Sequence, residues 1–124
     1  QPETRAVRDQ ILALREEGPV FLHLDFHSTH GDIFYTQPDS APSFPEGFTP
    51  RWLAALQARF PDYKVSRSSS YSSTSSTSHN WAYQTLGIPA ITYEIGDNTD
   101  RALLQRIAAG AAQEMMKLSL ELKK

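Results

Sequence analysis

The stretch V-F-L-H-L-D-F-H-S-T-H-G-D-I-F-Y, residues 20–35, decides how this chain folds. Its first half alternates between an apolar side and a side that carries polar residues. The apolar side holds Val20, Leu22, Leu24 and Phe26, and the polar side holds His23, Asp25 and His27. This period of two predicts a strand over residues 20–27, which ends where Ser28, Thr29 and Gly31 interrupt the pattern. Because ligands bind at the carboxyl ends of strands in open α/β sheets, we expect a functional site here.

The composition is that of one globular domain and excludes several classes of function. The 124 residues are 40% hydrophobic and 21% charged, with twelve Lys and Arg against fourteen Asp and Glu. With a net charge of −2 and no basic stripe, we expect no nucleic-acid partner. No apolar run approaches the roughly 20 residues of a membrane helix, so no membrane partner is expected. Because the chain has no cysteine, any metal must be held by His, Asp or Glu.

Hydrophobic periodicity predicts alternating helices and strands. Helices are expected over residues 2–17, 50–60 and 100–122. Strong strands are expected over residues 20–27 and 88–95, and weaker ones over 32–36 and 63–65. This order indicates an α/β fold, a layered sheet with helices on both faces. The chain opens directly into a helix with no initiator Met, so we expect residues 1–124 to form a single domain that is a piece of something longer.

Residues 66–78 are almost entirely Ser and Thr, placed around Arg67 and Tyr71. Composition alone is as typical of a flexible linker as of a binding loop. The segment N-W-A-Y, residues 80–83, has the character of a packed element and follows at once. A loop held between two ordered elements is more typical of a binding loop, which is the interpretation we favour.

Three residues of the polar side share one face of the first strand. Alternate residues of a strand lie about 6–7 Å apart, so His23, Asp25 and His27 can grip one ion only if their side chains bend inward. His23 is interpreted either as a core histidine hydrogen-bonded to a neighbour or as a ligand. His27 lies at the strand end, where it is a surface histidine or reaches a substrate. Asp25 is either a partner for His23 or a carboxylate behind a metal ligand.

Glu94 lies near the end of the second strong strand, I-P-A-I-T-Y-E-I. An ionised carboxylate on so apolar a strand destabilises the fold unless it forms an ion pair, and it is otherwise retained for a catalytic role. Glu94 is therefore either half of a buried salt bridge or a general base. A His and a Glu at two strand ends, in a chain without cysteine, favour metal-assisted hydrolysis. A serine nucleophile has no support, because no G-x-S-x-G motif occurs.

Two segments carry a family resemblance. They are D-F-H-S-T-H-G-D-I-F-Y-T, residues 25–36, and S-H-N-W-A-Y-Q-T-L-G-I-P-A-I-T-Y-E-I-G-D, residues 78–97. They resemble the C-terminal portion of the zinc carboxypeptidases of the carboxypeptidase A/B type. In that family one strand ends in a zinc ligand written His-Ser, and a later strand written T-[FY]-E-L carries the catalytic Glu. The resemblance covers nearly the whole chain and implies the C-terminal part of that fold, with zinc as the cofactor.

The resemblance also implies a role for individual residues. His27 would be the third zinc ligand, and Ser28 would be a neighbour that contacts substrate. Glu94 would be the general base that activates the attacking water and passes its proton to the leaving amine. Tyr71 resembles the Tyr that closes over the terminal carboxylate of a peptide, although its spacing to the following Trp is about one residue long. His79 would lie near the floor of the side-chain pocket, where a His departs from the family's apolar and acidic versions.

The family's first two zinc ligands come from an upstream H-x-x-E motif, and no H-x-x-E occurs in these residues. The substrate-binding arginines of the family also lie upstream. A catalytic zinc site needs three protein ligands, so the isolated chain should have little or no peptidase activity. The resemblance slightly favours a secreted or periplasmic protein.

Other readings of the same residues stay open. One is a zinc deacylase that cleaves N-acyl amino acids on the same scaffold. Another is a binding module that keeps the fold without the metal. In a third, His23 or His30 completes a metal site around His27. If strands that precede this segment are absent, a sheet edge is left open, and self-association through that edge is expected.

Overall fold

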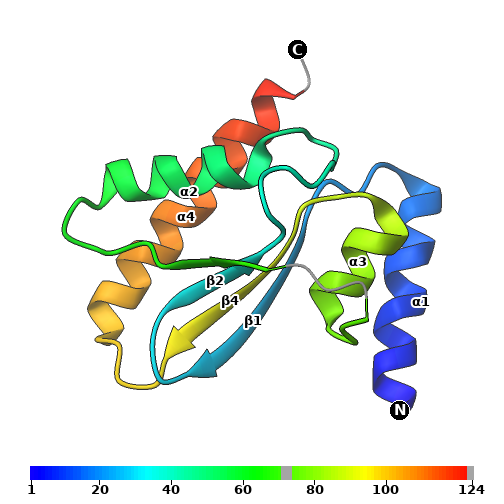
Figure 1. Cartoon of the computed structure of the whole chain (residues 1–124), viewed down its shortest axis with the longest axis horizontal. Helices are drawn as coiled ribbons and strands as arrows, with labels where there is room; N and C mark the ends of the chain where they lie inside the picture. The colour runs from blue at the N-terminus through cyan, green and yellow to red at the C-terminus, as the bar shows by residue number, and fades with distance from the viewer. Residues whose placement is uncertain (71–73, 123–124) are drawn as a thin grey trace.

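The structure is a computed structural model that describes residues 1–70 and 74–122 (Figure 1). Four helices and four strands occur within these ranges, which confirms the predicted α/β class. In chain order they are α1 (Pro2–Glu17), β1 (His23–Thr29), β2 (Ile33–Thr36), α2 (Phe48–Arg59), β3 (Arg67–Ser69), α3 (Ser78–Leu86), β4 (Ala90–Gly96) and α4 (Arg101–Glu121). None of the described helices is long and apolar enough to cross a membrane.

The strands form one mixed sheet in the order β1-β4-β2-β3. β1 runs parallel to β4, β4 runs antiparallel to β2, and β2 runs parallel to β3. The apolar β4 is therefore central, as expected for a strand of nearly continuous hydrophobic residues. β1 begins at His23 and not at Val20, because its ladder to β4 begins with the pair His23 and Ala90.

One face of the sheet carries the hydrophobic core, which lies under α2 and α4. Phe34 of β2 stacks on Tyr93 of β4 with ring centroids 4.1 Å apart, and Trp52 of α2 meets Phe34 edge-on. The Trp52 indole Nε1 donates a 2.8 Å hydrogen bond to the Ala111 carbonyl, which joins α2 to α4. The helices approach closely at Gly110, where a β-carbon would collide with the ring of Phe60.

The opposite face of the sheet is polar, and α3 lies over part of it. The sequence did not predict this helix. The helix begins at the end of the Ser/Thr run, where composition does not distinguish the capping residue from its neighbours. The Thr77 hydroxyl caps the helix by accepting from the Asn80 amide at 3.4 Å. The helix ends at Gly87, whose φ of 67° is a left-handed conformation that glycine adopts without strain.

The weak strand expected over residues 63–65 was wrong. The short strand lies at Arg67–Ser69 instead, inside the segment that we expected to be a loop. The Arg67 guanidinium fixes this strand, since its Nε donates to the Thr36 hydroxyl at 2.7 Å and its Nη2 to the Gln37 carbonyl at 2.9 Å. Side-chain contacts that composition does not reveal thus order the beginning of the Ser/Thr run.

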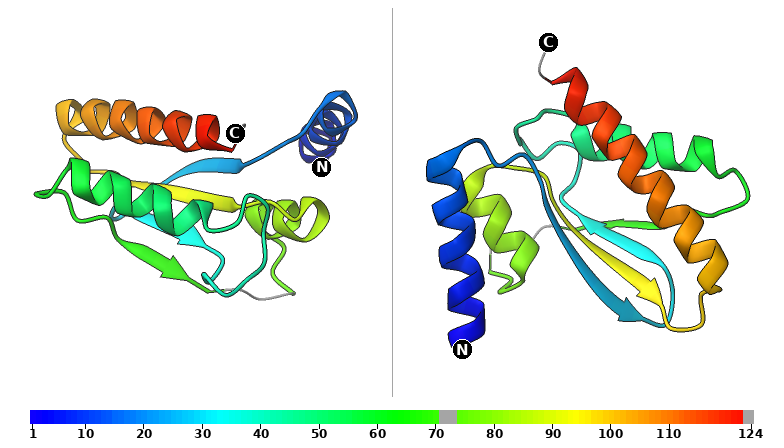
Figure 2. Two further views of the ribbon diagram at one scale, coloured as in Figure 1. Left: turned by 90° about the horizontal axis from the view of Figure 1, so that it is seen from above. Right: turned by 180° about the vertical axis from the view of Figure 1, so that it is seen from behind.

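Helix α1 has the predicted bounds but packs loosely. It lies beside α3, away from the α2 and α4 layer (Figures 1 and 2). Among the described residues, none in α1 is buried, and its Val7 side chain is 60% exposed. Arg15 donates to the Thr85 carbonyl of α3 at 3.2 Å. The apolar stripe that predicted this helix therefore faces mostly solvent.

Candidate active site

The register of the two parallel strands brings His27 and Glu94 side by side. They are directly paired in the β1–β4 ladder, so their side chains leave the same face of the sheet at the carboxyl ends of both strands. The His27 side chain is 53% exposed. Glu94 Oε2 is shielded from solvent and has no hydrogen-bond partner among the described residues. No Lys or Arg in that part of the chain pairs with Glu94, so the buried salt bridge considered above is not found there.

Asp25 lies next to His27 on the same face of β1. His27 Nε2 is 3.0 Å from Asp25 Oδ2, and the Ser78 hydroxyl donates to the same oxygen. Burial alone would raise the pKa of Asp25. The hydrogen bonds from Ser78 and His27 and the neighbouring histidines outweigh burial, so its pKa lies below the ordinary value. Asp25 is therefore an ionised acceptor at neutral pH.

Two more histidines approach this face. His79 of α3 has its Nδ1 2.9 Å from the hydroxyl of Thr92 on β4. Burial lowers the pKa of both His23 and His79, and the neighbouring charge of Asp25 only partly opposes this. His23 Nε2 is buried without a partner within the described ranges, so the hydrogen bond to a neighbour that one interpretation of His23 required is not found at this nitrogen. Both rings are neutral at pH 7.

A hydrogen-bond network around Asp32 holds the ends of the strands, and sequence reasoning missed it. Asp32 Oδ1 accepts from the Gly96 amide at 2.6 Å and from the Thr99 hydroxyl at 2.7 Å. Asp32 Oδ2 accepts from the Tyr63 hydroxyl at 2.8 Å, which in turn lies 2.9 Å from the hydroxyl of Tyr93. This carboxylate ties the turn after β1 to the turn after β4. The signal available in the sequence was an Asp directly after the turn residue Gly31.

The remaining site residues expected from the sequence fall in different places. His79 lies on the polar face against Thr92, which precedes Glu94 by two residues along β4. Ser28 is exposed, and strand alternation places its side chain on the face opposite His27. Tyr71 lies outside the described residues. Ser78 and Thr92 also belong to this face, although the sequence analysis did not single them out.

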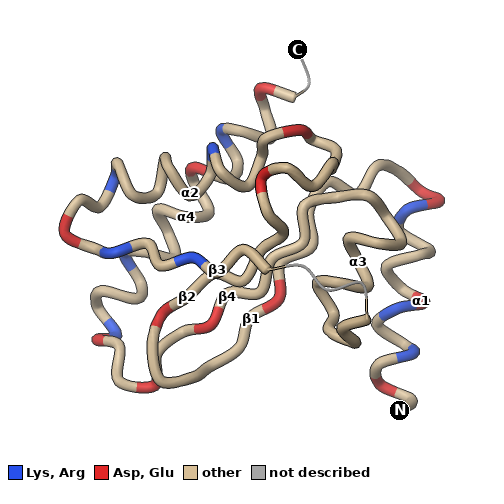
Figure 3. The backbone as a smooth tube through the Cα atoms, viewed as in Figure 1, with Lys and Arg blue, Asp and Glu red and all other residues tan. Residues whose placement is uncertain are grey.

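The donors on this face fit part of a metal site. An exposed imidazole and a carboxylate without a partner are suitable donors for zinc. Within residues 1–70 and 74–122, however, no three His, Cys, Asp or Glu side chains gather closely enough to hold an ion, with His23 and His30 included. Figure 3 shows that β1 and β4 each carry a carboxylate and no Lys or Arg, and β2 has no charged residue. The described residues therefore provide some of the ligands of a metal site and not a complete set.

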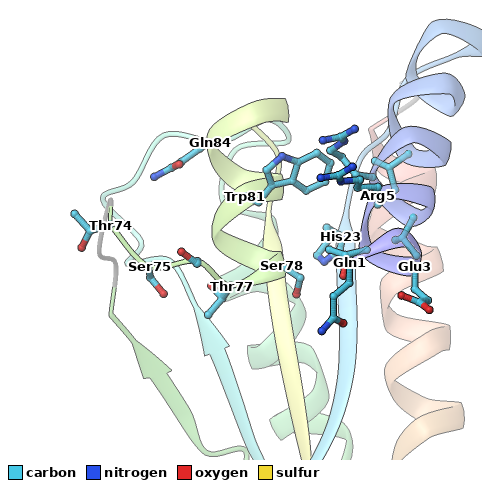
Figure 4. A pocket seen from close by; sticks show the side chains of 15 residues that line it. Gln1, Glu3, Arg5, His23, Thr74, Ser75, Thr77, Ser78, Trp81 and Gln84 are labelled. Atoms are coloured by element: carbon cyan, nitrogen blue, oxygen red, sulfur yellow. The ribbon is translucent and has the colours of Figure 1, made fainter.

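A cavity of about 750 Å³ lies between α1 and α3, close to this face but not at its carboxyl end (Figure 4). Arg5 lines it from α1 and Trp81 from α3. Only His23 and Ser78 connect it to the polar face, and neither His27 nor Glu94 lines it. Because one wall is the loosely packed α1, we do not place the reaction in this cavity.

The arrangement of this sheet and its helices has a counterpart among solved structures. No protein-family model matches the chain, and no curated protein matches it either. A metallo-carboxypeptidase from Burkholderia cenocepacia matches 98% of this chain with a TM-score of 0.64 and 19% sequence identity. The chain spans 34% of the length of that protein. At this identity the likeness establishes the fold, which this chain shares with part of a metallo-carboxypeptidase.

Proposed function

We propose that this chain forms the C-terminal portion of a zinc metallocarboxypeptidase-like hydrolase, which removes C-terminal residues from peptides. The observation that carries this proposal is the pairing of His27 with Glu94 on one polar face, at the carboxyl ends of two parallel strands. The fold shared with a metallo-carboxypeptidase supports it. The match to 34% of that protein also supports the view that these residues belong to a longer chain.

In this proposal His27 contributes one zinc ligand. A catalytic zinc site has three protein ligands and an open position, so the other two would come from residues outside these 124. When bound, zinc supplies Lewis-acid polarisation of the scissile carbonyl. The absence of Lys and Arg from the three neighbouring strands leaves the local charge negative, which favours a cation beside His27.

Glu94 would act as the general base. Its buried Oε2 has no hydrogen-bond partner among the described residues, so it is free to accept a proton from the attacking water. The water oxygen then bonds to the carbonyl carbon. Glu94 returns the proton to the amine nitrogen as the C–N bond breaks, and the carboxylate is regenerated. A general base of this kind contributes about 10²–10⁴-fold to the rate.

Substrate recognition would involve the residues around this pair. His79, held against Thr92, would lie at the floor of the side-chain pocket, and a neutral imidazole there can both donate and accept a hydrogen bond. Tyr71 would close over the terminal carboxylate of the peptide. Ser28, directly after His27, has its side chain on the opposite face of the sheet, so it would contact the substrate through its backbone.

The test is a comparison of two substrate classes with a longer chain that carries the residues preceding these 124. The proposal predicts zinc-dependent release of C-terminal residues from peptides, abolished by a chelator and restored by zinc. Cleavage of N-acyl amino acids in preference to peptides would indicate a zinc deacylase on the same scaffold. Absence of both activities in a zinc-loaded protein would indicate a binding module and overturn the proposal.

A further inference from the structure

We infer that the cavity between α1 and α3 is a binding site for a small aromatic carboxylate. Its volume of about 750 Å³ is typical of small-molecule sites in proteins. Neither His27 nor Glu94 lines the cavity, so this second site does not depend on the proposed function. The ligand would place its ring against Trp81 and its carboxylate toward Arg5 and His23.

The walls of the cavity offer an aromatic ring and an aliphatic surface. Trp81 of α3 is partly exposed, and Figure 4 shows its indole directed toward α1. Val7 and Ile11 line the cavity from α1, and the Val7 side chain is 60% exposed. Helices in proteins are stabilised mainly by burial of an apolar face, and none of the described residues of α1 is buried. A flat apolar ligand between Trp81 and the aliphatic side chains of α1 would bury both walls.

The charged groups of the cavity favour an anion. Arg5 forms no ion pair with any described residue, whereas the guanidinium of Arg8 is paired with Asp9 at 2.6 Å. Glu3 also lines the cavity, but Figure 4 shows its carboxylate directed away from Trp81. A guanidinium presents a planar pair of donors that matches the two oxygens of a carboxylate. Arg5 is therefore the group that would bind the carboxylate of the ligand.

His23 of β1 lines the same cavity and carries a second polar group without a partner. Its Nε2 is buried and has no hydrogen-bond partner among the described residues. Buried polar atoms in native proteins nearly always have a partner, so an unpartnered one indicates a missing ligand or solvent molecule. Burial lowers the pKa of His23, so its ring is neutral at pH 7 and can donate from Nε2. A carboxylate oxygen of the ligand would supply the missing acceptor.

A different occupant of the cavity would be a segment of a longer protein. The chain spans 34% of the metallo-carboxypeptidase that shares its fold, so residues outside these 124 could cover α1. The experiment therefore compares the 124-residue chain with the longer chain.

The experiment is calorimetric titration of both chains with phenylpropionate, in the presence of a chelator that removes zinc. We expect saturable binding at one site in each chain. Phenylpropylamine carries the same ring with a positive charge, and inorganic phosphate is an anion without a ring. Both should bind at least about 10-fold more weakly. By NMR, the indole N–H signal of Trp81 should shift on binding, and that of the core residue Trp52 should not.

Two variants test the polar groups, and two serve as controls. Arg5→Gln should weaken the binding of phenylpropionate by about 10–100-fold, because hydrogen bonds between charged groups are lost. His23→Leu should weaken it about 10-fold and leave the ligand-free chain at least as stable to urea, since it removes the unpartnered nitrogen. Arg106→Gln is the matched control, because Arg106 is exposed on α4 and does not line the cavity. His27→Ala should also keep full affinity, which separates the cavity from the polar face.

Absence of binding to either chain, or equal affinity in wild type and Arg5→Gln, would overturn the inference. Binding to the 124-residue chain that is lost in the longer chain would mean that residues of the longer protein fill the cavity, and would also overturn it. The titration uses no zinc and measures no hydrolysis, so its outcome is independent of the proposed hydrolase.

Discussion

β1 and β4 are neighbouring parallel strands of seven residues each, yet they differ sharply in burial. On the face toward α2 and α4, Phe26 of β1 and Tyr93 of β4 are paired in the ladder. The Phe26 side chain is 61% exposed, whereas Tyr93 is 3% exposed. β4 has a strand on each side and two helices above it. Within the described residues β1 has a strand on one side only, at the edge of the sheet.

This difference teaches that an apolar pattern predicts a strand but not how deeply the strand is buried. Burial depends on which elements cover the strand, and these come from distant parts of the sequence. For β1, the covering layer is incomplete among residues 1–70 and 74–122. The site follows the same division, because exposed His27 lies on β1 and the shielded Glu94 oxygen lies on β4.

The sharpest test of the comparison uses two phenylalanines that both contact Tyr93. Phe34 is fully buried with its ring centroid 4.1 Å from that of Tyr93, and Phe26 is largely exposed at 6.3 Å. Phe34→Ala should lower the free energy of unfolding by about 3–5 kcal/mol, because it leaves a cavity in the core. Phe26→Ala should cost at most about 1 kcal/mol. Urea unfolding measures both, and equal losses would mean that β1 is covered in solution.

A second test concerns the carboxylate that ties the turn after β1 to the end of β4. Burial acts to raise the pKa of Asp32, but hydrogen bonds from Thr99, Gly96 and Tyr63 outweigh it and lower the pKa. A lowered pKa stabilises the fold at pH values above the ordinary Asp value of about 3.9. This stabilisation is lost as the pH falls through the folded-state pKa. Asp32→Ala should therefore cost about 1–3 kcal/mol at pH 7 and progressively less in acid.

The measurement is urea unfolding of wild type and Asp32→Ala between about pH 7 and pH 3, a range that spans the ordinary Asp pKa. Asp9→Ala is a suitable control, because Asp9 is exposed on α1 and within the described residues its side chain pairs with the adjacent Arg8 alone. A difference between wild type and Asp32→Ala that stays constant with pH would contradict the stabilisation by an ionised Asp32.

The smallest expected effect concerns the free edge of β1. We propose that the isolated chain self-associates weakly through this edge, because open strand edges and exposed apolar side chains favour pairing. Light scattering over a range of concentrations should show a mass that rises above that of the monomer. Phe26→Lys should suppress the rise, and Ser69→Lys on the opposite edge strand β3 should not. A monomeric mass at the highest concentration would contradict the proposal.

The local features of the sequence predicted much of this fold. The apolar run over residues 88–95 predicted β4, and the helix expected over residues 100–122 is α4, which Asp100 caps by accepting from the Leu103 amide at 2.9 Å. The hydrophobic periodicity that predicted α4 includes Ile107 and Leu118, and both are buried. These features depend on residues near one another in the chain, so a single sequence contains them.

The features that the sequence did not predict depend on distant residues. The pairing of His27 with Glu94 is set by strand register across 67 positions of the chain, and nothing local specifies it. The role of Ser78 depends on a contact with Asp25, and composition made it indistinguishable from the other serines of its run. The exposure of Phe26 depends on which elements cover β1, and no described element covers this side chain. Individual site residues could be named from the sequence, but their grouping required the fold.

If His27 binds the metal and Glu94 transfers the proton, substitutions of the two residues must have different effects. The measurement that separates them is zinc affinity by calorimetry beside the rate of C-terminal residue release, in the longer chain. His27→Ala should lose both zinc and activity. Glu94→Gln should keep its zinc and lose about 10²–10⁴-fold in rate, while the exposed-carboxylate control Glu46→Gln should lose nothing. Wild-type activity in Glu94→Gln, or undiminished zinc affinity in His27→Ala, would contradict this division of roles.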